Sequence, residues 1–181
     1  MTDSPPTVDT NTVAMDTVEE FLAHAHTLEA EASDRFNEMA DSMEIHNNLE
    51  VAKLFRRLAH EGQKHAGQML ERAGGRELPS IAPWDLKLGG HGESPEAPSM
   101  EQAHYLMTPY HALDLARQAE MRVRDYYAAV AEASTNTDVV TLANELAAEE
   151  AEHVALIDEW ITKYPKPEKD WDFDPDPPVL P

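Results

Sequence analysis

The stretch AEEAEH, from Ala148 to His153, is the part of this chain that points most directly to a fold. It lies inside a long helical pattern, and Glu150 and His153 are three residues apart. On an α-helix this spacing places both side chains on one face, about one turn apart. A carboxylate oxygen and an imidazole nitrogen that converge there can bind a first-row metal ion. A solvated acidic helix with an incidental histidine would have the same sequence, so the other segments must decide.

Length, charge and cysteine content limit the classes of protein to consider. A chain of 181 residues is most simply one domain, long enough to bury a sizeable core. The 35 acidic and 14 basic residues give a net charge of -21, so binding to nucleic acid or to an anionic membrane is not expected. The absence of cysteine excludes thiolate zinc sites, iron–sulfur clusters and a rubredoxin-type iron site.

Both ends of the chain differ in composition from its middle. Residues 1–16 are acidic and proline-rich without a periodic pattern, and we predict a flexible N-terminal tail. They carry neither the basic region nor the apolar run of a signal peptide, so we expect a cytoplasmic protein. Residues 165–181 are acidic and proline-rich as well, and should be extended, lying on the rest of the protein or docking to a partner.

Residues 17–164 contain four segments in which apolar residues recur at alternating intervals of four and three, as in helices of a bundle. The first segment begins at the capping box Thr17–Glu20 and runs to a break at residues 46–48. The second ends at the stop signal Gly74-Gly75. The third begins at Thr108-Pro109, and the fourth covers about residues 138–164.

A long connection separates the second segment from the third. Residues 74–108 are rich in proline and glycine, and we predict a crossover loop, with a short helix at about residues 100–106. Short loops join antiparallel neighbours, whereas two parallel helices need a connection that spans the bundle. We therefore predict an all-α fold: a four-helix bundle of two helical hairpins joined by a long crossover loop.

Each apolar stripe is interrupted by residues that can bind metal. Glutamates interrupt the first and third stripes, and a Glu/His pair lies on each of the second and fourth. Several carboxylates buried without compensation would cost many kcal/mol, whereas two divalent cations would balance four of them. One Glu from each of two helices and a Glu/His pair from each of the other two is the arrangement of di-iron and di-manganese carboxylate bundles. The candidate ligands are Glu29, Glu61, His65, Glu120, Glu150 and His153.

These residues lie in motifs that resemble the ferritin-like superfamily and, within it, the rubrerythrin-like group. The resemblance covers roughly residues 17–164 and implies metal roles for Glu29, His65, Glu120, Glu150 and His153. The motifs are LEAEASDRF (Leu28–Phe36), LAHEGQKH (Leu58–His65), TPYHAL (Thr108–Leu113), AEMRVRDYY (Ala119–Tyr127) and EAEH (Glu150–His153).

The sequence departs from the family pattern at three points. The position three residues before His65, where the pattern has a Glu, is Gly62; Glu61 is a candidate substitute because residues four apart share a helix face. The extra carboxylate that rubrerythrins carry one turn from the third helix's Glu is missing next to Glu120. Without cysteine there is no rubredoxin electron donor. The symmetry of the metal pair therefore remains open.

We expect a non-haem di-iron carboxylate protein that binds Fe(II) in the bundle core and reacts it with O2 or peroxide, in iron oxidation, detoxification or storage. Two iron ions per chain are expected, with Mn or Zn as alternative metals. We also expect a homodimer; the electron donor is unknown. The alternatives are a degenerate one-metal site, in a metal carrier or interaction scaffold, and a di-iron oxygenase with a substrate cavity beside the metal.

Overall fold

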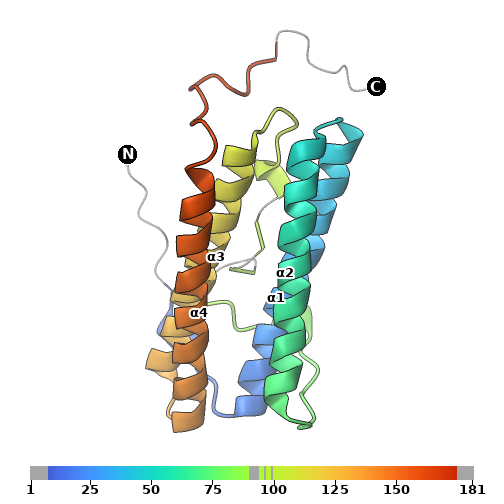
Figure 1. Ribbon diagram of the computed structural model, residues 1–181. Helices are drawn as coiled ribbons and strands as arrows, with labels where there is room; N and C mark the ends of the chain where they lie inside the picture. The colour runs from blue at the N-terminus through green and yellow to red at the C-terminus, as the bar shows by residue number, and fades with distance from the viewer. Residues whose placement is uncertain (1–7, 90–93, 96, 99, 175–181) are drawn as a thin grey trace.

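The computed structural model describes residues 8–89, 94–95, 97–98 and 100–174, and every regular element in them is helical. The predicted all-α class is confirmed. The four long helices pack as one elongated bundle (Figure 1). They are α1 (Val18–Ile45), α2 (Leu49–Ala73), α3 (Pro109–Ala133) and α4 (Thr137–Ile161). Short 3-10 helices are η1 (Thr10–Thr12), η2 (Pro83–Asp85) and η3 (Met100–Gln102).

The bundle consists of two antiparallel hairpins. Helix α1 packs along α2, and α3 packs along α4, while contacts between the hairpins are sparser. The connection between α2 and α3 returns along the bundle to its opposite end, so α2 and α3 run parallel (Figure 1). The predicted pair of hairpins joined by a crossover is confirmed.

The helix ends follow local signals in the sequence. The Thr17 hydroxyl accepts a hydrogen bond from the Glu20 backbone N–H at 3.1 Å, which caps the start of α1. Pro109 occupies the first turn of α3, where its missing N–H costs nothing. Gly74 caps the C-terminal end of α2, and its φ of 61° is left-handed and therefore favours glycine.

The apolar core is divided into two clusters. One contains Phe21, Leu28 and Tyr127, at the end of the bundle where α1 begins. The other contains Phe36 and Phe55, toward the opposite end. The metal-ligand candidates lie on the helix segments between these clusters, so the polar centre is enclosed by apolar layers along the bundle axis.

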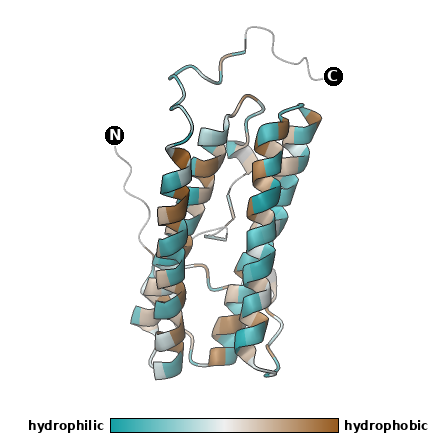
Figure 2. Cartoon of the chain, in the orientation of Figure 1, coloured by the Kyte–Doolittle hydropathy of each residue, from teal (hydrophilic) through white to brown (hydrophobic). Residues whose placement is uncertain are grey.

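The two helices nearest the viewer differ in hydropathy. Helix α2 shows mostly hydrophilic residues on its visible face, whereas α4 shows several hydrophobic residues toward its C-terminal end (Figure 2). No helix in the described part of the chain combines the length and hydrophobicity that a membrane span requires.

The prediction of a flexible tail is wrong for residues 8–16, while residues 1–7 lie outside the described residues. Val13 and Met15 are fully buried in the core. The Lys87 ammonium donates a hydrogen bond to the Ala14 carbonyl at 2.6 Å, and the Ser134 hydroxyl donates one to the Met15 carbonyl at 2.7 Å. The segment was misjudged because two isolated apolar residues can be buried without any periodic pattern.

Candidate metal centre

Helix α4 contributes the pair that the sequence singled out. Glu150 and His153 are one turn apart on the face of α4 that points into the bundle, and His153 Nδ1 lies 2.8 Å from Glu150 Oε2. Glu150 is only 2 % exposed, whereas the His153 side chain is partly exposed. The solvated-helix interpretation therefore fails for Glu150, because its carboxyl group is buried.

Helix α3 brings Glu120 to the same place. Its Oε2 lies 3.5 Å from His153 Nδ1. Glu120, Glu150 and His153 each offer one ligand atom, and these three atoms lie within 4.8 Å of one another. Two carboxylates and one imidazole are a donor set that a first-row metal ion accepts. The α3/α4 hairpin thus carries a carboxylate/His cluster that could hold a metal ion.

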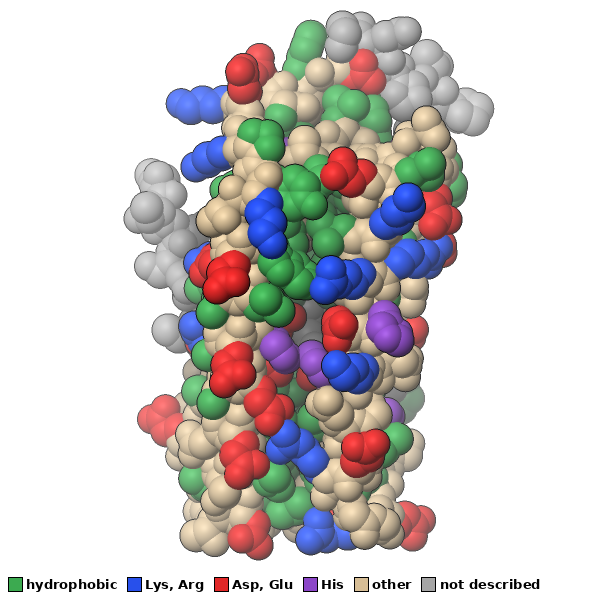
Figure 3. Space-filling view, viewed as in Figure 1, with side chains coloured by type: hydrophobic (Ala, Val, Ile, Leu, Met, Phe, Trp, Pro, Cys, Tyr) green, Lys and Arg blue, Asp and Glu red, His purple; other side chains and the backbone are tan. Residues whose placement is uncertain are grey.

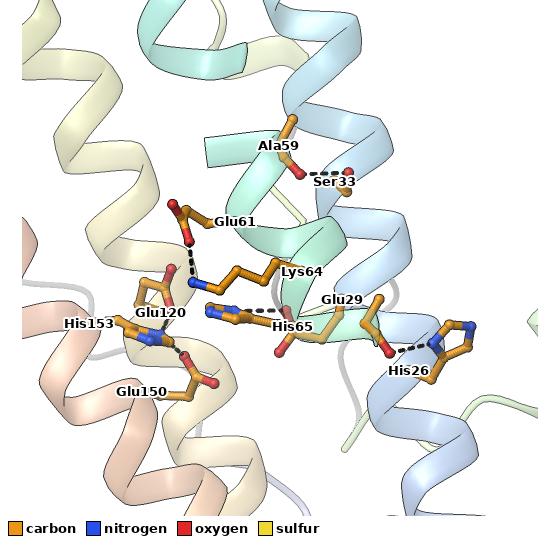
Figure 4. A network of polar contacts seen from close by, with 11 residues as sticks. His26, Glu29, Ser33, Ala59, Glu61, Lys64, His65, Glu120, Glu150 and His153 are labelled. Atoms are coloured by element: carbon orange, nitrogen blue, oxygen red, sulfur yellow. Dashed lines mark hydrogen bonds and ion pairs between the residues drawn. The ribbon is translucent and has the colours of Figure 1, made fainter. Parts of the chain in front are cut away.

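The α1/α2 hairpin contributes a second, smaller group. Glu29 of α1 is 1 % exposed, and its Oε2 lies 3.5 Å from Nδ1 of His65 on α2. The His65 ring stacks on the His153 ring, with centroids 4.6 Å apart and an interplanar angle of 2°. Figure 4 shows His65 pointing from α2 toward His153, so the two groups form one continuous network across the bundle.

The contacts within this network shift the pKa values of its histidines and of Glu120. Hydrogen bonds with Glu120 and Glu150 raise the pKa of His153 to about 10, against the opposing effect of burial. Burial, and then the nearby His153 charge, lower the pKa of His65. Burial opposes ionisation of Glu120, but its hydrogen bonds with His153 and Glu150 keep its pKa below the ordinary value. At pH 7 these shifts favour the imidazolium form of His153 and the neutral form of His65 in the metal-free protein.

The chemistry of this donor set fits iron. Three carboxyl groups and two imidazoles without a thiolate suit Fe(II), Mn(II) or Zn(II). In the metal-free protein the His153 imidazolium is shared by two carboxyl groups, Glu120 and Glu150, while the buried Glu29 carboxyl group contacts His65. A divalent cation would compensate them better than a single proton, and it would displace that proton from His153.

Glu61 is not brought into the network. Its carboxylate pairs with the Lys64 ammonium at 3.3 Å, and its side chain is 43 % exposed (Figure 4). It lines the same pocket as His65 but belongs to no cluster of close donors found among the described residues. The physical reason is its place on α2 beside a lysine and open to solvent, where a charged carboxylate is most easily accommodated.

Gly62, the position at which the family pattern has a Glu, faces α1. A Cβ atom added there would lie 3.3 Å from the Glu29 carbonyl oxygen and 3.4 Å from the Ser33 backbone nitrogen. The Ser33 hydroxyl donates a hydrogen bond to the Ala59 carbonyl at 2.8 Å, which also holds the two helices together. The second helix therefore offers His65 alone to the network.

The sequence did not reveal a pocket beside this centre. It has a volume of about 280 Å³ and opens between α2 and α4, and His65, Glu120 and His153 are among its lining residues. Arg57 and Trp160 also line it. The only signal in the sequence for Arg57 and Trp160 is their spacing to His65 and His153 along α2 and α4. The pocket itself could not be predicted, because the sequence does not give the distance between the two hairpins.

The fold and the site together define a class: a ferritin-like four-helix bundle with a carboxylate/His cluster at its centre. Comparison with known proteins agrees. The family model described as Rubrerythrin matches residues 20–83, which include α1 and α2. The cluster of three close donors lies on the other hairpin, so the two observations are independent.

A solved structure extends the similarity to most of the chain. It is an uncharacterized conserved protein from Magnetospirillum magnetotacticum MS-1, 43 % identical, with a TM-score of 0.63; the match covers 84 % of this chain and 98 % of that one. No curated protein matches. This chain therefore carries a rubrerythrin-family domain of the ferritin-like type over residues 20–83 and belongs to one family with that uncharacterized protein, which confirms the resemblance inferred from its motifs.

Proposed function

We propose that this protein binds Fe(II) at the centre of the bundle and reacts it with O2 or peroxide, in iron oxidation, detoxification or storage. Membership of the rubrerythrin family, which implies a di-iron site, supports the proposal. The observation that carries it is the network in which donors from all four helices meet. Glu29, His65, Glu120, Glu150 and His153 form it without a break.

The residues divide into a stronger and a weaker group. Glu120, Glu150 and His153 would hold one ion, because three donors already lie close together. Glu29 and His65 would hold a second ion, with fewer protein ligands. Iron at such a site would supply the electrons that reduce the oxidant. The chain's own part is to keep the donors in place between the two apolar clusters and to release the His153 proton.

One structural observation favours a second candidate function. Because Gly62 packs against the α1 main chain and Glu61 pairs with Lys64, α2 supplies one donor where the family pattern has two. A protein with only the Glu120/Glu150/His153 ion would be a one-metal carrier or scaffold. An electron donor, a homodimer and the choice of iron over Mn or Zn remain parts of the proposal.

Rates of iron oxidation test the proposed function directly. Fe(II) is added to the protein under air or with peroxide, and formation of Fe(III) is followed by its near-ultraviolet absorbance. Glu150→Gln should slow the initial rate at least about tenfold, because it removes the carboxylate that His153 contacts most closely. Glu152→Gln is the matched control, since Glu152 is exposed on the same helix. Equal rates in the two variants would contradict the proposal.

A further inference from the structure

The pocket beside the candidate metal centre is apolar along its walls. Leu58 lines it from α2, and Leu156 and Ile157 line it from α4. Trp160 follows His153 by two turns of α4, so the lined stretch is about 10 Å long. The lining is therefore elongated along the helices, with the polar groups of the centre at one end and apolar side chains beside them.

This hydrophobic lining is open to solvent. Leu156 is 45 % exposed. Figure 3 shows hydrophobic side chains gathered in a hollow between α2 and α4, bordered by histidines and by both basic and acidic side chains. Contiguous apolar surface in a concave site, with a few polar groups at defined positions, is typical of a small-molecule site.

Arg57 gives the outer part of the pocket a charge. Its guanidinium lies over the Trp160 ring, 4.3 Å from the ring centroid. In the described part of the chain no carboxylate lies within ion-pairing distance of Arg57, although acidic residues outnumber basic ones 35 to 14. Its neighbour Arg56, in contrast, binds Asp41 and Glu44 on α1. A guanidinium held on an aromatic ring at an apolar pocket suits a carboxylate ligand.

The other charges at the pocket do not change this conclusion. Lys64 is paired with Glu61 at 3.3 Å, so these two side chains nearly cancel. Glu120 of the metal centre is paired with His153. Arg57 is therefore the charge left over for a ligand, and it lies away from the carboxyl groups of the centre.

We propose that this pocket binds a small organic carboxylate, with its carboxylate group on Arg57 and its apolar chain along Leu58, Leu156 and Ile157 toward the stacked histidines. The size of the pocket suits a medium-chain or aryl-substituted acid such as octanoate or 3-phenylpropanoate. The inference goes beyond the proposed function, because ligand binding requires Arg57 and the apolar walls but no metal.

Calorimetric titration of the metal-free protein with octanoate tests the charged end of the pocket. Arg57→Ala should weaken binding about tenfold or more, because it removes a charge-assisted hydrogen bond. Arg56→Ala is the matched control and should bind like the wild type, since Arg56 faces α1. Octylamine, which has the same chain with the opposite charge, should bind at least about tenfold more weakly than octanoate.

The same titration tests the apolar walls. Each methylene removed from the ligand should weaken binding about fourfold. Leu156→Ser should weaken octanoate binding several-fold, and this variant should fold because Leu156 is exposed.

Both arginine variants should keep the wild-type number of bound metal ions, which separates failure of this inference from failure of the proposed function.

Several results would overturn the inference. These are no binding of either octanoate or 3-phenylpropanoate at millimolar concentration, equal effects of the two arginine variants, or equal affinity for octylamine. A dimer in light scattering that Leu156→Ser dissociates and octanoate leaves unchanged would assign the hollow to a second copy of this chain instead.

Discussion

Gly62 shows how packing and ligation compete at a single residue. The two helices of the first hairpin approach so closely there that an added Cβ would lie 3.3 Å from the Glu29 main-chain oxygen. A glutamate at this position would have to push α1 away before its carboxylate could reach a metal. The missing ligand is therefore linked to the tight contact that also positions Glu29.

Alanine substitutions at two glycines of α2 should differ in their effect on the free energy of unfolding. Gly67→Ala should raise the free energy of unfolding by about 0.5–1 kcal/mol, because a Cβ there meets nothing within 4 Å and alanine favours helix. Gly62→Ala should lack this gain, and Gly62→Glu should lower the free energy by about 1–3 kcal/mol. Urea unfolding measures all three. A stable Gly62→Glu protein that binds an additional metal ion would contradict this prediction, because it would show that α1 can move away from α2 at little energetic cost.

At the scale of elements, the segment before α1 is part of the bundle. Val13 and Met15 fill the core, and Lys87 of the crossover loop donates to the Ala14 carbonyl while pairing with Glu20 of α1 at 2.7 Å. The N-terminal segment, the crossover loop and the first helix are thus held together at one end of the molecule.

Shortening the Met15 side chain should show that this segment contributes to the stability of the fold. Met15→Ala should lower the free energy of unfolding by about 2–4 kcal/mol, because it leaves a cavity in a fully buried site. Asp16→Ala, at the exposed neighbouring position, should change it by less than about 0.5 kcal/mol. Chemical denaturation compares the two. A loss for Met15→Ala no larger than for Asp16→Ala would mean that residues 8–16 are a loose tail after all.

The Lys87–Glu20 pair should make stability depend on pH. Burial alone would raise the pKa of Glu20, but the hydrogen bond and charge of Lys87 outweigh it and lower the pKa below 4.5. The pair is partly exposed, so Lys87→Met should cost only about 0.5–1 kcal/mol at pH 7. The contribution of Glu20 is complete above its unfolded pKa and is lost as the pH falls through the lower folded value. A difference between variant and wild type that grows in acid would contradict this.

Much of the architecture was predictable from particular residues. Unbroken stripes that Glu29 and Glu120 interrupt, and the length of the crossover, indicate the two hairpins without further information. Periodicity also placed five of the six candidate ligands in one network. It could not place Glu61, because the face that α2 turns to α1 depends on the close approach at Gly62. Burial of the N-terminal segment and the pocket depend on tertiary packing alone.

At the scale of the whole molecule, the net charge of -21 acts against compactness. Salt screens this repulsion, with a Debye length that falls to about 3 Å at 1 M. We therefore expect the melting temperature of the metal-free protein to rise by several degrees between low salt and about 0.5 M NaCl. Thermal denaturation followed by circular dichroism measures this. A melting temperature that falls with salt would show that ion pairs such as Arg72–Glu149 outweigh the general repulsion.

We propose that donors from four helices form an iron site with a stronger half, Glu120, Glu150 and His153, and a weaker half, Glu29 and His65. Anaerobic titration with Fe(II), with metal counted per chain by native mass spectrometry, tests it most directly. We expect two ions in succession, with His65→Ala retaining the first and His153→Ala losing it. One ion alone would support the one-metal carrier instead. Binding that is unchanged in both histidine variants, or no binding at all, would contradict the account.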